Sequence, residues 1–237
     1  MIKILFFITS ILLLSCQSKH WSYSENHISN SWANISKDYQ LCRDGNQQSP
    51  IDLSMSISKK VLQKINIDYH DDYAEVLNDG HTIKEKFKKS NHIEINNHKY
   101  YLNQLHFHAH SEHSLDGIYY PLEIHLVHQS LLGELAVVAL LVEISSKKKN
   151  EYGFFKNIDK GKTFVKLSKI SNMTRGFFYY EGSLTTPPCT ENVKWVILDK
   201  HIILNRSQLE PFKKYYRNNY RPINEYNEHK LEHSNFN

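Results

Sequence analysis

The sequence predicts a single domain of mostly β (α+β) class with short helices at its periphery. Three observations support this fold class. Eight runs of residues are rich in β-branched or aromatic side chains and contain stretches with the two-residue period of a strand. Turn signals containing Asn, Asp or Gly separate many of these runs. Glycine and proline are sparse, and no biased segment marks a boundary within the 237 residues, so we expect one core.

The predicted strands lie, in chain order, at residues 64–70, 73–80, 81–87, 92–110, 120–130, 135–144, 177–186 and 193–204. The turn signals are Asp79-Gly80, Asn96-Asn97, Asp116-Gly117 and Leu132-Gly133.

Helical segments are expected to be few and short. Residues 56–65 are ambiguous, and residues 151–170 are compatible with a helix and a connector. Residues 207–218 predict a helix that begins with Ser207 as its N-cap. Glu210 three residues later would complete a capping box.

The first residues predict an export signal that lies outside the fold. Residues 4–14 are apolar and follow Lys3, and the sequence Leu-Leu-Ser-Cys ends at Cys16. A helix of this length covers about 17 Å, whereas the hydrocarbon core of a bilayer is about 30 Å thick. The segment is too short to span a membrane, so we interpret it as a cleaved signal. Its ending resembles a bacterial lipobox, which predicts a lipid on Cys16. An ordinary signal with an incidental cysteine is the alternative.

We therefore expect a lipoprotein-type signal peptide at residues 1–15, a tether at 16–19 and one domain at 20–237. The protein would be exported to the periplasm or held at the bacterial envelope by its lipid. Cys42 and Cys189 would then be the one cysteine pair of the domain. An oxidising compartment favours a disulfide between them, with two unrelated free thiols as the alternative.

The charge distribution argues against nucleic acid as a partner. The formal net charge is +4 with histidine neutral, and the lysines are dispersed apart from short runs. A nucleic-acid-binding protein usually carries a concentrated basic face.

Six of the fifteen histidines fall within residues 102–128. Residues two apart on a strand share a face, so His106 and His108 point together, and His125 follows on the next predicted strand. Adjacent antiparallel strands lie about 4.8 Å apart, so three imidazoles from two such strands can converge on one metal ion.

Polar residues accompany these histidines on the same strand faces. Gln104 precedes His106 by two residues, and Glu123 precedes His125 by two. A metal-bound imidazole needs an acceptor for its other N–H group, and these side chains are placed to provide it. Three nitrogen ligands leave one position of a tetrahedral zinc ion open, which is typical of a catalytic site. Copper and nickel are alternatives, but a site without Cys or Met ligands favours zinc.

Several motifs together resemble the α-class carbonic anhydrases, most closely the exported bacterial forms. They are QLHFHAHSEHSLDG with YPLEIHLVH, GSLTTPPCTENVKW, QQSPIDL, LNDGH and NYRP, within a match from about residue 20 to 222. The resemblance implies a zinc lyase that interconverts carbon dioxide and bicarbonate through attack by zinc-bound hydroxide. It also implies a large, twisted, mainly antiparallel central sheet.

The resemblance assigns roles to individual residues. The three histidines would bind Zn²⁺. Thr185 would accept a hydrogen bond from the hydroxide, and Glu112 would accept the threonine proton in turn. His81 would carry the proton to solvent, although an exposed turn histidine without a role is the alternative. Cys42 and Cys189 match the disulfide of the bacterial branch.

The implied substrate site is formed by small and apolar residues. Thr186 would lie beside bicarbonate. The carbon dioxide pocket would be lined by Val127, Val137, Leu184, Val193 and Trp195.

The sequence departs from the family pattern near the expected site. Asp79 and Lys84 stand near His81 where the family tends to carry uncharged amides, and we expect these charges to shift the pKa of His81. His110 follows the HxH pair, and we expect it to lie beyond the metal.

Two rival functions are a catalytically silent carbonic-anhydrase-like binding domain and a zinc-scavenging lipoprotein. The first usually lacks a zinc histidine, and the second usually concentrates its histidines in a flexible tract.

Overall fold

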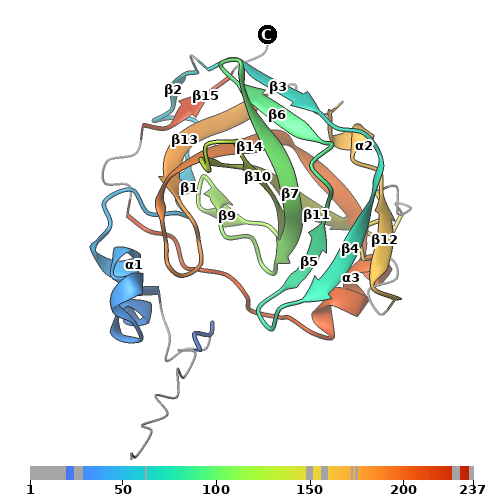
Figure 1. Cartoon of the computed structure of the whole chain (residues 1–237), viewed down its shortest axis with the longest axis horizontal. Coiled ribbons are helices and arrows are strands. Elements are labelled where there is room, and N and C mark those ends of the chain that lie inside the picture. The colour runs from blue at the N-terminus through green and yellow to red at the C-terminus, as the bar shows by residue number, and fades with distance from the viewer. Residues whose placement is uncertain are drawn as a thin grey trace, which may run out of the picture.

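The computed structural model describes residues 20–23, 29–61, 63–147, 152–155, 160–171, 173, 176–225 and 230–234 (Figure 1). The expected signal peptide, the tether and Cys16 lie outside these residues. The helices are α1 (Leu41–Asp44), α2 (Ser168–Ser171) and α3 (Arg206–Lys213), with short 3₁₀ turns at Ser29–Asn34 and Lys37–Tyr39. The strands are β1 (Asp52–Leu53), β2 (Lys59–Lys60), β3 (Ile65–Asp68), β4 (Asp72–Asn78), β5 (Ile83–Lys86), β6 (His92–Ile95), β7 (His98–His108), β8 (Ser114–Leu115), β9 (Ile118–Tyr119), β10 (Leu122–Gln129), β11 (Leu135–Ser145), β12 (Lys162–Val165), β13 (Phe177–Ser183), β14 (Glu191–Asn205) and β15 (Glu232–His233).

Among the described residues, one 12-stranded sheet dominates the structure, and its main path runs β12-β4-β5-β7-β10-β11-β14-β13-β15-β2. Strands β3 and β6 extend it beside β7, and β1, β8 and β9 form a small second sheet. Within the main sheet the pairs are antiparallel except β11 with β14 and β15 with β2. The three α-helices lie at the periphery of the sheet (Figure 1). The predicted fold class is therefore confirmed.

The alternation of side chains along the central strands produces two cores, one on each face of the sheet. On β10, Ile124 and Leu126 face the larger apolar cluster, while Val127 packs against the smaller one. On β11, Val138 joins the larger cluster and Val137 the smaller one. Because both faces of these strands are buried, β11 is an almost continuous apolar run.

Two predicted elements need correction. The helix predicted from residue 207 begins at Arg206, and its N-cap is Asn205 rather than Ser207. The Asn205 side chain accepts the Ser207 backbone N–H, and the Gln208 side chain accepts the Asn205 N–H, so the capping box begins two residues earlier than predicted. The predicted strand at 92–110 is divided into β6 and β7 by the Asn96-Asn97 turn, where both residues have positive φ.

The two segments with uncertain assignments also contain strands. Residues 56–65 include β2, and residues 151–170 include β12 followed by α2. In both cases a short strand is stabilised by pairing with a distant part of the chain, β15 for β2 and β4 for β12.

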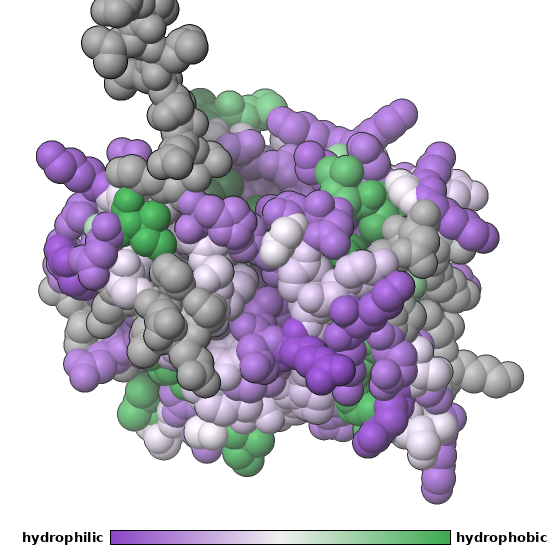
Figure 2. Space-filling view, turned by 90° about the horizontal axis from the view of Figure 1, so that it is seen from below, coloured by the Kyte–Doolittle hydropathy of each residue, from purple (hydrophilic) through white to green (hydrophobic). Residues whose placement is uncertain are grey.

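Hydrophilic side chains dominate the face shown in Figure 2, where apolar side chains form separate patches. Within the part of the chain that the structure describes, no helix has the length and apolar character needed to cross a bilayer.

Candidate metal centre

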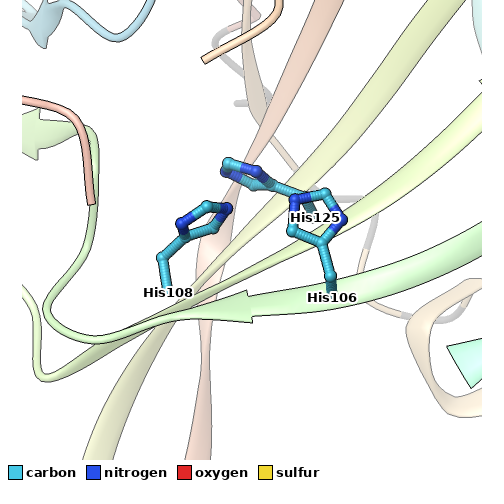
Figure 3. A group of neighbouring side chains, drawn as sticks. All are labelled: His106, His108 and His125. Carbon is cyan, nitrogen blue, oxygen red and sulfur yellow. The ribbon is translucent and has the colours of Figure 1, made fainter. Parts of the chain in front are cut away.

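His106, His108 and His125 converge at one point between β7 and β10 (Figure 3). The antiparallel register places His106 directly opposite His125, and His108 lies two residues further along β7. The ring centroids are 4.9 Å apart for His106 and His108, 5.2 Å for His106 and His125, and 4.6 Å for His108 and His125. One ring nitrogen from each residue lies within 4.8 Å of the others. The two-residue period therefore brings together the three histidines singled out from the sequence.

Two of the rings are oriented by the polar side chains that precede them by two residues. His106 Nδ1 lies 3.0 Å from Gln104 Oε1, and His125 Nε2 lies 2.7 Å from Glu123 Oε1. These contacts occupy one nitrogen of each ring and leave His106 Nε2 and His125 Nδ1 for the centre.

The third ring is held by a residue that we did not single out from the sequence. His108 Nδ1 lies 2.6 Å from the backbone carbonyl oxygen of Asn219, 111 residues further along the chain. The Asn219 side chain fixes that carbonyl, because its oxygen accepts the Ala109 N–H and its amide donates to the Phe107 carbonyl. A main-chain acceptor leaves no side-chain signal, so the sequence pattern gave no indication of it.

Burial keeps the three imidazoles neutral. Burial, and after it the nearby His125, lowers the pKa of His108 to about 3. Burial, together with the two neighbouring histidines, places the pKa of His106 well below its ordinary value. Burial also lowers the pKa of His125, although Glu123 opposes this effect. Neutral imidazole is the form that binds a metal ion.

His108 Nε2 is buried and has no hydrogen-bond partner among the described residues. Most buried polar nitrogens are paired, because an unpaired one loses its hydration without compensation. An unpaired imidazole nitrogen facing two other imidazoles is the arrangement expected of a metal site.

A second cluster, His113 with Glu123 and His125, is a hydrogen-bonding network. The two oxygens of Glu123 are already in use: Oε1 lies 2.7 Å from His113 Nδ1 and 2.7 Å from His125 Nε2. Oε2 accepts the backbone N–H groups of Glu112 and His113, each at 2.8 Å. The remaining ring nitrogen of His113 lies 2.7 Å from the Tyr180 hydroxyl. The cluster therefore holds His125 in place, and His113 is another residue that the sequence reasoning missed.

Glu112 and Thr185 are both buried, and Glu112 lies beside the histidines, with Oε1 3.4 Å from His108 Nδ1 and Oε2 3.9 Å from His125 Nδ1. Burial raises the pKa of Glu112 well above its ordinary value, while the Thr185 hydroxyl and the Arg221 backbone N–H act in the opposite direction. The Arg221 N–H donates to Glu112 Oε1 at 2.7 Å. Glu112 Oε2 makes no hydrogen bond of standard geometry with the described residues, so the Thr185 hydroxyl is a near neighbour rather than a tightly bonded partner.

The loop that carries Thr185 is attached to the N-terminal part of the domain. It connects β13 to β14 and is cross-linked by a Cys42–Cys189 disulfide with an S–S distance of 2.07 Å. The buried guanidinium of Arg221 donates to the carbonyls of Cys42 and Ser49, each at 2.8 Å. The loop, α1 and the C-terminal segment are thereby fixed relative to one another.

An apolar wall lies on the same face of the sheet as His125. Its members were all singled out from the sequence, and all pack in or against one buried cluster: Val127, Val137, Leu184, Val193 and Trp195. The Trp195 ring centroid is 4.9 Å from that of His125, so the wall adjoins the histidines directly. Thr186, which follows Thr185 in the loop, is half-buried.

His81 lies outside the histidine cluster, in the turn between β4 and β5. Its backbone N–H donates to Asp79 Oδ1 at 3.0 Å, and Asp79 Oδ2 lies 2.6 Å from Lys84 Nζ. The ring stacks on the Trp21 indole with centroids 3.7 Å apart. Partial burial lowers the pKa of His81, and the Asp79 carboxylate acts in the opposite direction. His81 is thus a half-buried, titratable side chain on a defined turn.

His110 is separate from the three histidines. Its ring packs against Tyr220 with centroids 3.8 Å apart and against Tyr119 at 4.6 Å. Its Nδ1 lies 2.6 Å from the Ser111 carbonyl oxygen. It therefore belongs to an aromatic cluster beyond the end of β7.

Comparison with known proteins identifies the same family throughout. The family model for eukaryotic-type carbonic anhydrase matches residues 27–235. The carbonic anhydrase of Neisseria gonorrhoeae is 32% identical over 237 residues, covering 86% of this chain and 87% of that protein. The carbonic anhydrase of Pectobacterium carotovorum is 30% identical over 215 residues, covering 87% of each. The solved α-carbonic anhydrase of Thermovibrio ammonificans, in complex with the inhibitor sulfanilamide, has 31% identity and a TM-score of 0.78, covering 90% of this chain and 98% of that one.

Proposed function

The chain belongs to the eukaryotic-type (α) carbonic anhydrase family of enzymes, and from this premise we propose that it catalyses the zinc-dependent, reversible hydration of carbon dioxide to bicarbonate and a proton. The observation that carries the proposal is the convergence of three neutral imidazoles, one of which has a buried nitrogen that no described residue contacts through a hydrogen bond. Neither rival function is favoured by a specific feature of the described residues.

The residues fit a zinc ion. His106 and His108 would each bind it through Nε2 and His125 through Nδ1, because the other nitrogen of each ring already has an acceptor. Three nitrogen ligands are typical of catalytic zinc sites that keep one position open. A zinc ion bound there would act as a Lewis acid and make water a nucleophile at neutral pH.

Thr185 and Glu112 would orient the nucleophile. The Thr185 hydroxyl has one proton to donate, and Glu112 as a carboxylate would accept it. The oxygen of Thr185 can then accept a hydrogen bond only from a group that carries a proton, which favours water or hydroxide at the centre over fully deprotonated anions. The Arg221 N–H on Glu112 supports this arrangement, because it favours the ionised carboxyl and holds it in place.

The apolar wall would hold carbon dioxide beside the nucleophile. Val127, Val137, Leu184, Val193 and Trp195 offer no strong hydrogen-bonding group to the site, and the Trp195 N–H donates to the Ser183 carbonyl. A small uncharged molecule can replace water against such a wall at little cost in free energy. Thr186 lies next to Thr185 and would contact bicarbonate.

His81 would transfer the product proton to solvent. It is partly exposed and titratable, and an imidazole accepts and releases a proton near neutral pH with little bias. The stacked Trp21 indole and a backbone hydrogen bond to Asp79 restrict its motion and hold the ring at the β4–β5 turn.

We also propose that the enzyme is exported and lipid-anchored through Cys16. The Cys42–Cys189 disulfide supports export, because disulfides persist in oxidising compartments. Mass spectrometry of the native N-terminus tests the anchor: a diacylglyceryl mass on Cys16 is expected, and an unmodified N-terminus would contradict it.

The test of the activity is stopped-flow hydration of carbon dioxide on a sample of known zinc content, before and after chelation. We expect activity proportional to bound zinc, lost on chelation and restored by zinc. A protein that holds one equivalent of zinc and does not hydrate carbon dioxide would contradict the proposal.

A further inference from the structure

A cavity of about 670 Å³ lies between the C-terminal end of α3 and the segment that follows β7. Glu210, Lys213 and Lys214 line it from the helix, and Ala109 and His110 line it from the end of β7. A water molecule occupies about 30 Å³ in the liquid, and cavities of about 300–1,000 Å³ are typical of sites for small organic ligands. The cavity is therefore large enough for a ligand bigger than an inorganic ion.

The amphipathic character of α3 places charged side chains at this cavity. Leu209 is buried in the larger apolar cluster, which fixes one face of the helix against the domain. Glu210, Lys213 and Lys214 are three and four residues apart, a spacing that puts side chains on one helical face, and all three are exposed. Arg217, also exposed, lines the same cavity from the segment that follows the helix.

The positive charges at the cavity have no partners within the protein. Among the residues that the structure describes, Lys213, Lys214 and Arg217 form no ion pair. Glu210 is the one carboxylate in the lining, so with His110 neutral the three cations leave a formal excess of two positive charges. A helix C-terminus favours nearby lysines, but Arg217 lies beyond the helix. A cavity lined mainly by one sign of charge attracts ions of the other sign, here anions.

The end of β7 and its neighbours supply a ring nitrogen and apolar surface. His110 Nδ1 lies 2.6 Å from the Ser111 carbonyl oxygen, so Nε2 is the ring nitrogen left for a ligand. Asn218 adds an amide, and Ala109 and Pro121 line the cavity with apolar groups. A ligand in the cavity can thus direct an anionic group towards the cations and an uncharged part towards the apolar groups.

We propose that this cavity binds a phosphate monoester. Such a group carries a charge of about −1.5 to −2 at pH 7, which matches the excess positive charge, and its three oxygens accept from several donors at once. A guanidinium pairs with phosphate through two parallel hydrogen bonds, which makes Arg217 the principal contact. Inorganic phosphate would leave most of the volume unfilled, so the phosphate is carried by an organic molecule, either a soluble monoester or a lipid headgroup.

The site is separate from the candidate metal centre. None of the three converging histidines lines the cavity. Binding of the phosphate should therefore not require zinc, and the proposal goes beyond the proposed hydration activity without depending on it.

Isothermal titration calorimetry of the full-length, zinc-loaded protein tests the site with glycerol 3-phosphate as the soluble probe. We expect saturable binding, and glycerate, which carries a carboxylate in place of the phosphate, should bind at least about tenfold more weakly. Chelation of the metal should leave the affinity for glycerol 3-phosphate unchanged. Equal affinity for glycerate, or loss of binding on chelation, would overturn the proposal.

Variants assign the binding to the cavity. Arg217→Gln removes the guanidinium and should weaken binding at least about tenfold. Arg206→Gln makes the same charge change at the other end of α3, outside the cavity, and is the matched control. Glu210→Gln removes the lining carboxylate and should tighten binding about twofold, a gain that misfolding cannot produce. Equal affinities of the two arginine variants, or weaker binding by Glu210→Gln, would overturn the proposal.

Vesicles distinguish the two sources of the phosphate. Cosedimentation is compared at limiting lipid between phosphatidylcholine vesicles with and without phosphatidic acid, whose headgroup is a phosphate monoester. A lipid on Cys16 would attach the protein to both kinds of vesicle, so the difference between them reports the cavity. A preference for phosphatidic acid that Arg217→Gln removes would support a lipid headgroup, and calorimetric binding without that preference would support a soluble monoester. Absence of both would overturn the proposal, whatever the hydration activity of the same sample.

Discussion

The candidate metal centre and the proposed proton-exit region, which is the β4–β5 turn with His81, are built in opposite ways. At the centre, His106, His108 and His125 sit on long, fully paired strands, and each ring is held by an acceptor. In the exit region, His81 sits on a turn and is restricted by a stacked indole and one backbone hydrogen bond. At the centre His108 and His125 are buried, and desolvation lowers the pKa of all three imidazoles, whereas His81 lies half-buried on a turn and is titratable.

This contrast in burial shows how histidine can serve in one protein as a metal ligand and as a proton carrier, the two roles proposed above. Burial in the sheet suppresses protonation, so an imidazole there is available as a ligand. Partial exposure on a turn allows protonation and release, as a proton carrier requires. Substitutions at the centre should therefore abolish the reaction, while those in the exit region should only slow it under conditions in which proton transfer limits the rate.

The largest effect is expected for His106→Ala. Loss of one of three ligands should remove zinc and reduce carbon dioxide hydration by more than about 100-fold, since changes to outer-shell partners alone cost about 10–100-fold. Zinc content and hydration rate are measured on the same sample, with His98→Ala on the same strand as the control. An active zinc-free variant would remove the metal from the mechanism.

A smaller effect is expected for Thr185→Ala, which should lower kcat by about 100-fold without loss of zinc, because a preorganised hydrogen bond to the reacting group is removed. Thr185→Ser keeps the hydroxyl and is the matched control. Equal kinetics of the alanine and serine variants would show that the hydroxyl does not orient the nucleophile.

His81→Ala should act on the exit region alone. We expect kcat in weak buffer to fall at least about tenfold, kcat/KM to be retained, and added imidazole to restore turnover. His70→Ala, at an exposed position, serves as the control. A loss of kcat that does not depend on buffer concentration would indicate a structural effect and would contradict a role of His81 in proton transfer.

The smallest effect is expected for Asp79→Asn. The asparagine oxygen can still accept the His81 N–H, so the turn is kept while the carboxylate charge is lost. Because that charge raises the pKa of His81, its removal should lower the pKa and shift half-protonation to lower pH. The titration of the ring is followed by nuclear magnetic resonance, with Asp44→Asn as an exposed control. Turnover should change by less than about threefold, and a higher pKa would contradict the assigned sign.

Much of the centre could be predicted from the sequence because it follows from strand periodicity. Gln104, His106 and His108 share a face of β7, and Glu123 and His125 share a face of β10, as alternation requires. The large sheet and the disulfide are likewise present as expected. These features depend on local spacing or on residue type.

The parts that escaped prediction depend on contacts between distant segments. The Asn219 carbonyl that holds His108 is a main-chain group. The stack of Trp21 on His81 joins residues sixty positions apart, far beyond the reach of a strand or helix period. The N-cap of α3 was misassigned because Asn205 and Ser207 are both good capping residues, and the end of β14 decides between them.

The Cys42–Cys189 bond also affects how the molecule would respond to cleavage. The two cysteines are separated by 147 residues, so the bond encloses most of the strands of the main sheet. A protease that cuts a surface loop between them, such as the exposed Leu131-Leu132 hairpin, would leave both fragments covalently joined. Such a nicked enzyme would migrate as one intact chain on a non-reducing gel and separate into two only after reduction.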